Sequence, residues 1–136
     1  MRHGCSTAPT KGGCCVQATT RDYARFGQFI LDGAHIEGQS IVADGWLDAA
    51  TRMQVDIGEA GSGYGYLWWT RDNGTLSAYG LYGQQIYIDP ARRLVVAITS
   101  AWSVPEFTNE SRVARTALLD AIRAAIDSER RSYAGK

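Results

Sequence analysis

The sequence predicts an α+β fold in which helices pack on an antiparallel sheet of three to four strands. Apolar residues recur with helical spacing in residues 19–33 and 109–130, whereas residues 64–100 contain the aromatic-rich and alternating runs that are typical of strands. The turns between those runs are short. Short connections join antiparallel strands, because parallel strands need long crossovers.

The first helix is predicted to begin at Thr19 or Thr20, either of which can cap it, with Asp22 in its first turn. Gly33 is placed to end this helix. Four apolar side chains share one face of it: Tyr23, Phe26, Ile30 and Leu31. The result is an amphipathic helix of about three turns.

A turn around Glu37 and Gly38 is predicted within residues 34–42, followed by a short helix over residues 44–53. Residues 55–63 are rich in glycine and are expected to be irregular. Three side chains form the predicted buried stripe of the short helix: Trp46, Leu47 and Ala50.

Four segments then have strand character: residues 64–70, 75–79, 84–89 and 94–100. Residues 72–74, Asp-Asn-Gly, and residues 90–93, which begin with proline, are turn signals. Ile86 and Ile88 should share one face of their strand. Trp68 and Trp69 should point to opposite faces, so that one packs in the core and the other lines a surface or groove.

The run over residues 94–100 is almost wholly apolar, as expected of a strand that is covered on both faces. A long helix is predicted to begin near Asn109 or Ser111 and to end near Arg130. Seven residues form its apolar stripe: Val113, Ala117, Leu118, Ala121, Ile122, Ala125 and Ile126.

The composition is that of a globular protein, with 45% apolar and 21% charged residues in a chain of 136. Such a length suggests at most one domain. The formal net charge is zero and the basic residues are dispersed, so we expect no nucleic-acid partner. The longest nearly uncharged stretch is too short for a membrane span, and the first residues precede no apolar run, so we expect no signal peptide in this chain.

The domain organisation is predicted as a flexible tail over residues 1–12, a folded portion over residues 13–130 and a C-terminal tail over residues 131–136. The three cysteines lie at the N-terminal end, and their odd number is a poor basis for disulfides. A zinc site is the minor alternative, and its spacing matches no common ligand pattern. Its ligands would be His3, Cys5, Cys14 and Cys15.

The most informative segment for function is residues 78–84, AYGLYGQ, in which two glycines flank a strand end beside aromatic residues. A glycine there often marks close approach of a ligand to the backbone. A β-bulge, or an ordinary strand end with packed aromatic rings, explains the spacing equally well.

Several segments, taken in order, resemble one superfamily. They are residues 13–27 (GCCVQATTRDYARFG), 36–42 with Trp46, 64–69 (YGYLWW), 80–84 (GLYGQ), 87–90 (YIDP) and 94–96 (LVV). The ordered set resembles the C-terminal third of serine hydrolases of the class C β-lactamase and penicillin-binding protein superfamily, and is most similar to the 6-aminohexanoate-dimer hydrolase and esterase-like branch. The resemblance implies a partial β-lactamase-like fold.

Members of that superfamily use a Ser-x-x-Lys motif for the nucleophile, a Tyr-x-Asn motif or a relative of it, and a Lys/His-Thr/Ser-Gly triplet on a sheet strand. The two lysines of this chain, Lys11 and Lys136, do not follow a serine by three positions, and no tyrosine precedes an asparagine by two. Residues 78–80 align with the triplet, of which only Gly80 matches. These departures put β-lactamase or carboxypeptidase activity in doubt.

The resemblance also implies site residues. The backbone N–H of Leu81 corresponds to one donor of the oxyanion hole, the other donor being on the nucleophile. Tyr79 and Tyr82 would shape the substrate pocket. Gly80 would let the substrate approach, and Gly83 would let the chain turn.

The predicted function is therefore that of a part of a serine hydrolase, which acts on small amides or esters through an acyl-enzyme and is inactive alone because the nucleophile is missing. We expect no cofactor and no metal, and we expect self-association through uncovered apolar surface. Two alternatives stay open: a non-catalytic binding module derived from a degenerate hydrolase, and an unrelated small α+β domain.

Overall fold

The structure is a computed structural model of the 136-residue chain and describes residues 16–104 and 109–135. The predicted α+β class is confirmed. In chain order the described elements are α1 (Thr20–Leu31), β1 (His35–Ile36), β2 (Gln39–Ser40), α2 (Trp46–Thr51), β3 (Val55–Asp56), β4 (Ser62–Tyr64), β5 (Trp69–Arg71), β6 (Leu76–Tyr79), β7 (Gln85–Asp89), β8 (Leu94–Ile98) and α3 (Asn109–Ala134). The tail predicted over residues 1–12, the three cysteines and the alternative zinc ligands lie outside the described residues.

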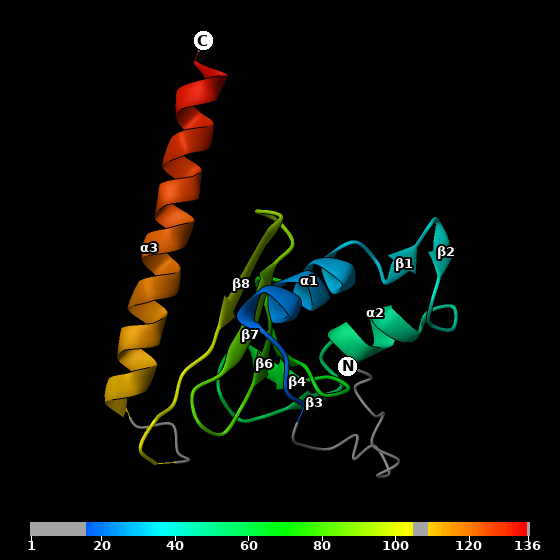
Figure 1. Cartoon of the computed structure of the whole chain (residues 1–136), viewed down its shortest axis with the longest axis horizontal. Coiled ribbons are helices and arrows are strands. Elements are labelled where there is room, and N and C mark those ends of the chain that lie inside the picture. The colour runs from blue at the N-terminus through cyan, green and yellow to red at the C-terminus, as the bar shows by residue number, and fades with distance from the viewer. Residues whose placement is uncertain (1–15, 105–108, 136) are drawn as a thin grey trace, which may run out of the picture.

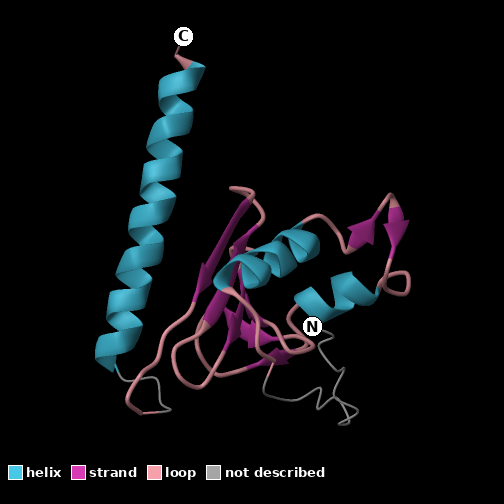
Figure 2. Cartoon of the chain, in the orientation of Figure 1, coloured by secondary structure: helices cyan, strands magenta, loops and turns pink. Residues whose placement is uncertain are grey.

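One antiparallel sheet contains β3 to β8 in chain order, and β1 pairs with β2 in a separate hairpin. Figure 1 shows α1 and α2 on one side of the sheet and α3 on the other, and Figure 2 shows the small hairpin apart from the main sheet. Among the described residues this sheet has six strands, where three to four were predicted. No helix within the described ranges is long and apolar enough to cross a membrane.

The extra strands arise where a single strand was predicted over residues 64–70. The chain folds back there, because the N–H of Gly65 donates to the carbonyl of Trp68 at 2.7 Å and Leu67 has a positive φ of 66°. A side chain at Gly65 would overlap the carbonyl oxygen of Ala50, so only glycine lets α2 approach this bend. β3 was missed because two residues are too short to show a period.

Helix α1 begins as predicted. Thr19 caps it by accepting a hydrogen bond from the N–H of Asp22 at 3.2 Å, and Gly33 follows its end with a φ of +83°. The helix packs on β7 and β8 with Gly27 facing the sheet, where an added Cβ would overlap Val95 and Ile86. This close contact sets the distance between α1 and the sheet.

The two faces of the sheet differ in chemistry. The face under α1 carries the apolar core, which confirms that Ile86 and Ile88 share a face; the core cluster comprises Ile30, Ala50, Trp68, Leu76, Ile86 and Ile88. Alternation along the paired strands places a polar and aromatic set on the opposite face, toward α3: Ser62, Trp69, Arg71, Ser77, Tyr79, Gln85 and Tyr87. Trp68 is buried and Trp69 is exposed, as the pattern predicted.

One prediction of a buried side chain is wrong. Trp46 is exposed and lies against Tyr66, while Ala50 alone of its stripe is fully buried. In α3, Val113 and Leu118 of the apolar stripe are exposed. Helix α3 faces the polar side of the sheet, where ion pairs hold it.

Helix α3 also continues to Ala134, past the predicted end near Arg130. Strand β8 is only half-buried, and it is an edge of the sheet. An edge strand offers unpaired backbone groups to another chain. Self-association of the chain therefore stays a prediction.

Candidate functional site

The segment that the sequence singled out forms a tight turn between β6 and β7. The N–H of Gly83 donates to the carbonyl of Gly80 at 3.2 Å, which closes a four-residue turn with Leu81 and Tyr82 at its centre. Neither central residue has a positive φ, whereas Gly83 has a φ of +88°. This is the pattern of a type I turn, in which glycine is favoured at the fourth position.

The side chain of Gln84 organises this turn. Its Oε1 accepts a hydrogen bond from the N–H of Tyr82 at 3.1 Å, and its Nε2 donates to the carbonyl of Ser100 at 3.1 Å. The Gln84 carbonyl also accepts from the N–H of Gly80 at 2.8 Å. One glutamine thus ties the turn to the segment that follows β8.

The backbone amide of Leu81 differs from its neighbours in its hydrogen bonding. The N–H groups of Gly80, Tyr82 and Gly83 all have acceptors, but no acceptor among the described residues receives the N–H of Leu81. Leu81 is an exposed residue, with 67% of its surface accessible. The turn therefore holds one backbone donor without an acceptor at an exposed residue.

The two glycines serve packing and turning. Beside Gly80, the space that a Cβ would take is filled by the side chain of Gln84. That Gly80 lets a substrate approach stays a prediction. A Cβ on Gly83 would overlap the indole ring of Trp102. Gly83 is required both for the left-handed backbone and for the approach of this ring.

The two tyrosines of the segment lie in different environments. Tyr82 is exposed, whereas Tyr79 is half-buried, with its ring centroid 6.0 Å from that of Trp69. The guanidinium of Arg115 lies 4.6 Å from the Tyr79 ring centroid and 5.4 Å from that of Trp102. Such cation–π contacts favour a charged guanidinium over an aromatic face.

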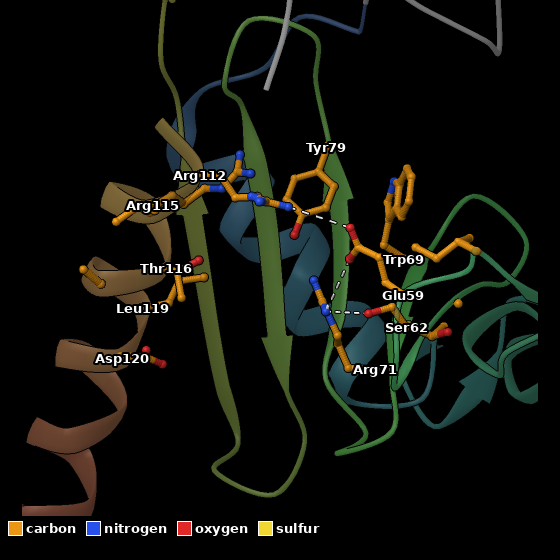
Figure 3. Close-up of a pocket in the computed structure, with 15 residues that line it drawn as sticks. Glu59, Ser62, Trp69, Arg71, Tyr79, Arg112, Arg115, Thr116, Leu119 and Asp120 are labelled. Carbon is orange, nitrogen blue, oxygen red and sulfur yellow. Dashed lines mark hydrogen bonds and ion pairs between the residues drawn. The ribbon is translucent and has the colours of Figure 1, made fainter. Parts of the chain in front are cut away.

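Tyr79 also lines a pocket of about 550 Å³ between α3 and strands β4 to β6, and it is the one predicted site residue that does so. Figure 3 shows Arg112 and Arg115 extending from α3 toward Tyr79 and Glu59. The described residues that line it are Ile57, Glu59, Ser62, Gly63, Trp69, Thr70, Arg71, Tyr79, Arg112, Val113, Arg115, Thr116, Ala117, Leu119 and Asp120.

Charged groups meet in this pocket. Arg71 donates to the hydroxyl of the buried Ser62, and the carboxylate of Glu59 lies 4.0 Å from Arg71 and 3.7 Å from Arg112. Burial lowers the pKa of Arg115, and the nearby Tyr79 opposes that shift. A guanidinium remains protonated in proteins all the same, so Arg115 carries positive charge into the pocket.

Sequence reasoning missed Glu59 and the arginines of this pocket. A signal was available for the strand residues, because Trp69 and Arg71 alternate onto one face. Arg112 and Arg115 are three apart and so share a helix face, but nothing in the sequence says which strands that face meets.

Similarity to known proteins identifies the class to which this fold belongs. The chain belongs to the β-lactamase family, whose model matches residues 5–121. It is 30% identical over 120 residues to the 6-aminohexanoate-dimer hydrolase of Paenarthrobacter ureafaciens, a match that covers 80% of this chain and 31% of the relative.

A solved structure gives the same result. The putative 6-aminohexanoate-dimer hydrolase from Bacillus anthracis is similar with a TM-score of 0.62 and 27% identity, over 82% of this chain and 30% of that one. The chain thus spans under a third of the length of either relative. The resemblance to this branch of serine hydrolases is confirmed.

Proposed function

We propose that this chain forms one wall of a serine-hydrolase active site that cleaves small amides or esters through an acyl-enzyme. The observation that carries the proposal is the N–H of Leu81, which has no acceptor among the described residues while its neighbours in the turn have theirs. Family membership and two relatives named as 6-aminohexanoate-dimer hydrolases support the reaction class.

The proposed role of Leu81 is electrostatic. Attack on a carbonyl places negative charge on its oxygen, and a backbone N–H held in advance at that position stabilises the charge in the transition state. A leucine can occupy such a position because the backbone, and not the side chain, donates the hydrogen bond. Gln84 is the proposed positioning residue, since it binds the N–H of Tyr82 and fixes the turn around Leu81.

The nucleophile and its base must come from outside these 136 residues, because the chain contains no Ser-x-x-Lys motif. Groups that act together in covalent catalysis lose nearly all activity when the nucleophile is removed. The chain alone is therefore proposed to be inactive. The exposed Leu81 and Tyr82 side chains leave the turn accessible to the segment that supplies the serine.

The experiment is a complementation assay with nitrophenyl esters. The chain alone is compared with a fusion in which the part of the Paenarthrobacter ureafaciens enzyme that this chain does not cover is joined to residue 16. We expect turnover only from the fusion, with labelling by a serine-directed phosphonate.

Two results would count against the proposal. Phosphonate-sensitive turnover by the chain alone would contradict its inactivity. A folded fusion that labels but does not turn over would favour the alternative, a non-catalytic binding module.

A further inference from the structure

The pocket under α3 has a composition that the hydrolase proposal does not use. Its lining includes three arginines against two carboxylates, and one of those, Asp120, already pairs with Arg123 at 3.2 Å. A cluster of guanidinium groups drawn from α3 and the sheet favours an anionic ligand.

A carboxylate from the protein itself marks where such an anion would bind. Glu59 lies between Arg71 on β5 and Arg112 in the first turn of α3, as the dashed lines in Figure 3 show. The helix N-terminus adds partial positive charge at the same place. The geometry at Glu59 is thus that of a two-arginine carboxylate site drawn from two separate elements.

The Glu59 ion pairs are weak enough to be exchanged. Their N–O distances of 4.0 and 3.7 Å exceed the roughly 2.8 Å of close charge-assisted hydrogen bonds. All three side chains are also more than half exposed, and exposed ion pairs contribute little to stability. A ligand carboxylate that approaches more closely can therefore replace Glu59.

The position of Arg71 also supports binding of a ligand carboxylate. Its guanidinium donates to the hydroxyl of Ser62, which is only 2% exposed, so a buried group on β4 orients it. An arginine held in advance loses less conformational entropy when a ligand binds.

The remaining residues of the pocket suit the apolar part of a small ligand. Trp69 and Tyr79 form an aromatic wall, with Arg115 stacked on the Tyr79 ring. Val113 and Leu119 line the side formed by α3. A volume of about 550 Å³ lies within the range of small-molecule sites.

We propose that this pocket binds a small amphipathic carboxylate, whose charged group takes the place of Glu59 between Arg71 and Arg112 and whose apolar body lies against Trp69 and Tyr79. The ligand class follows from the pocket alone and does not depend on the hydrolase proposal. Binding would bridge α3 and the sheet.

The test is calorimetric titration of the 136-residue chain with three probes: 4-phenylbutyrate, its neutral amide, and butyrate. We expect 4-phenylbutyrate to bind at least about tenfold more tightly than either other probe, since one charged hydrogen bond or one buried ring accounts for such a factor. Equal binding of the amide would overturn the carboxylate site. Equal binding of butyrate would overturn the aromatic wall, and no heat from 4-phenylbutyrate at millimolar concentration would overturn both.

Three variants locate the site. Glu59→Gln removes the competing charge at an exposed position and should tighten 4-phenylbutyrate binding severalfold, whereas Arg71→Met should weaken it about tenfold. Arg93→Ala, which removes an exposed arginine paired with Asp32, is the control and should change nothing. Should Arg71→Met fail to fold, Glu59→Gln decides alone: unchanged or weaker binding in that variant would refute the proposal.

Discussion

Arg92 forms a doubly hydrogen-bonded ion pair with Asp127, with Nε–Oδ1 and Nη2–Oδ2 distances of 3.0 and 2.8 Å. The two residues are 35 positions apart, and they join the turn after β7 to the C-terminal half of α3. Arg92 also contacts Asp89 at 3.0 Å, and Arg123 of α3 approaches the same carboxylate at 3.5 Å. This network places α3 over the polar face of the sheet and so forms one side of the pocket.

Asp89 is the member of the network whose loss should cost most. Its side chain is 1% exposed, and it accepts hydrogen bonds from both the N–H and the guanidinium of Arg92, so its loss leaves these donors without an acceptor. Asp89→Ala is expected to lower the free energy of unfolding by about 2 kcal/mol or more. Asp127→Ala, at a more exposed position, is the comparison and should cost less. Urea denaturation of both variants checks this order, and the reverse order would refute it.

The same network makes stability depend on pH. The hydrogen bond from Arg92 lowers the pKa of Asp127 below its ordinary value of 3.8. A lowered pKa in the folded state means that the stabilisation is fully present above the unfolded value and is lost as the pH falls through the folded value. Asp127→Asn should therefore melt below the wild type at neutral pH and converge with it below 3.8. Calorimetric melting temperatures that keep a constant gap across this range would contradict the assignment.

The turn should respond sharply to a methyl group at Gly83. Gly83→Ala combines a positive φ with overlap on the Trp102 ring, and we expect a loss of about 2 kcal/mol or more. Gly74→Ala is the matched control: its φ is +78° but no atom lies within 4 Å of the added carbon, so only backbone strain of about 1 kcal/mol applies. Equal losses in the two variants would show that Trp102 does not pack on the turn.

The hydrogen bonding of the turn can be tested amide by amide. Hydrogen exchange followed by NMR should show fast exchange at Leu81 and slower exchange at Gly80, whose N–H donates to the Gln84 carbonyl at 2.8 Å. If the Leu81 amide were protected as strongly as that of Gly80, its N–H would already donate to an acceptor and could not serve as the proposed catalytic donor.

Much of the fold could be predicted from local signals. The Thr19 cap, the end of α1 at Gly33 and the shared face of Ile86 and Ile88 depend on short-range chemistry and were confirmed. The bend at Gly65 could not be predicted, because it depends on the backbone of Ala50 approaching from α2.

The turn and the pocket also differ in how far they could be predicted from the sequence. The turn around Leu81 was found because its glycines stand out in the sequence and match a family pattern. The pocket was not found, because Glu59, Arg71 and Arg112 are far apart in the chain and come together only when α3 is placed. The placement of α3 depends on ion pairs such as that between Arg92 and Asp127, which leave no periodic signal.

The most direct test of the central claim is the turnover number of the hydrolase fusion with proline or alanine at position 81. Leu81 occupies the second position of a type I-like turn, where proline is well tolerated, so Leu81→Pro deletes the N–H with little strain. Leu81→Ala keeps the N–H and is the control. We predict that Leu81→Pro lowers kcat by about a hundredfold or more while Leu81→Ala stays within about tenfold of the unsubstituted fusion. Equal kcat values for the two variants, with circular dichroism showing both folded, would contradict the role of Leu81.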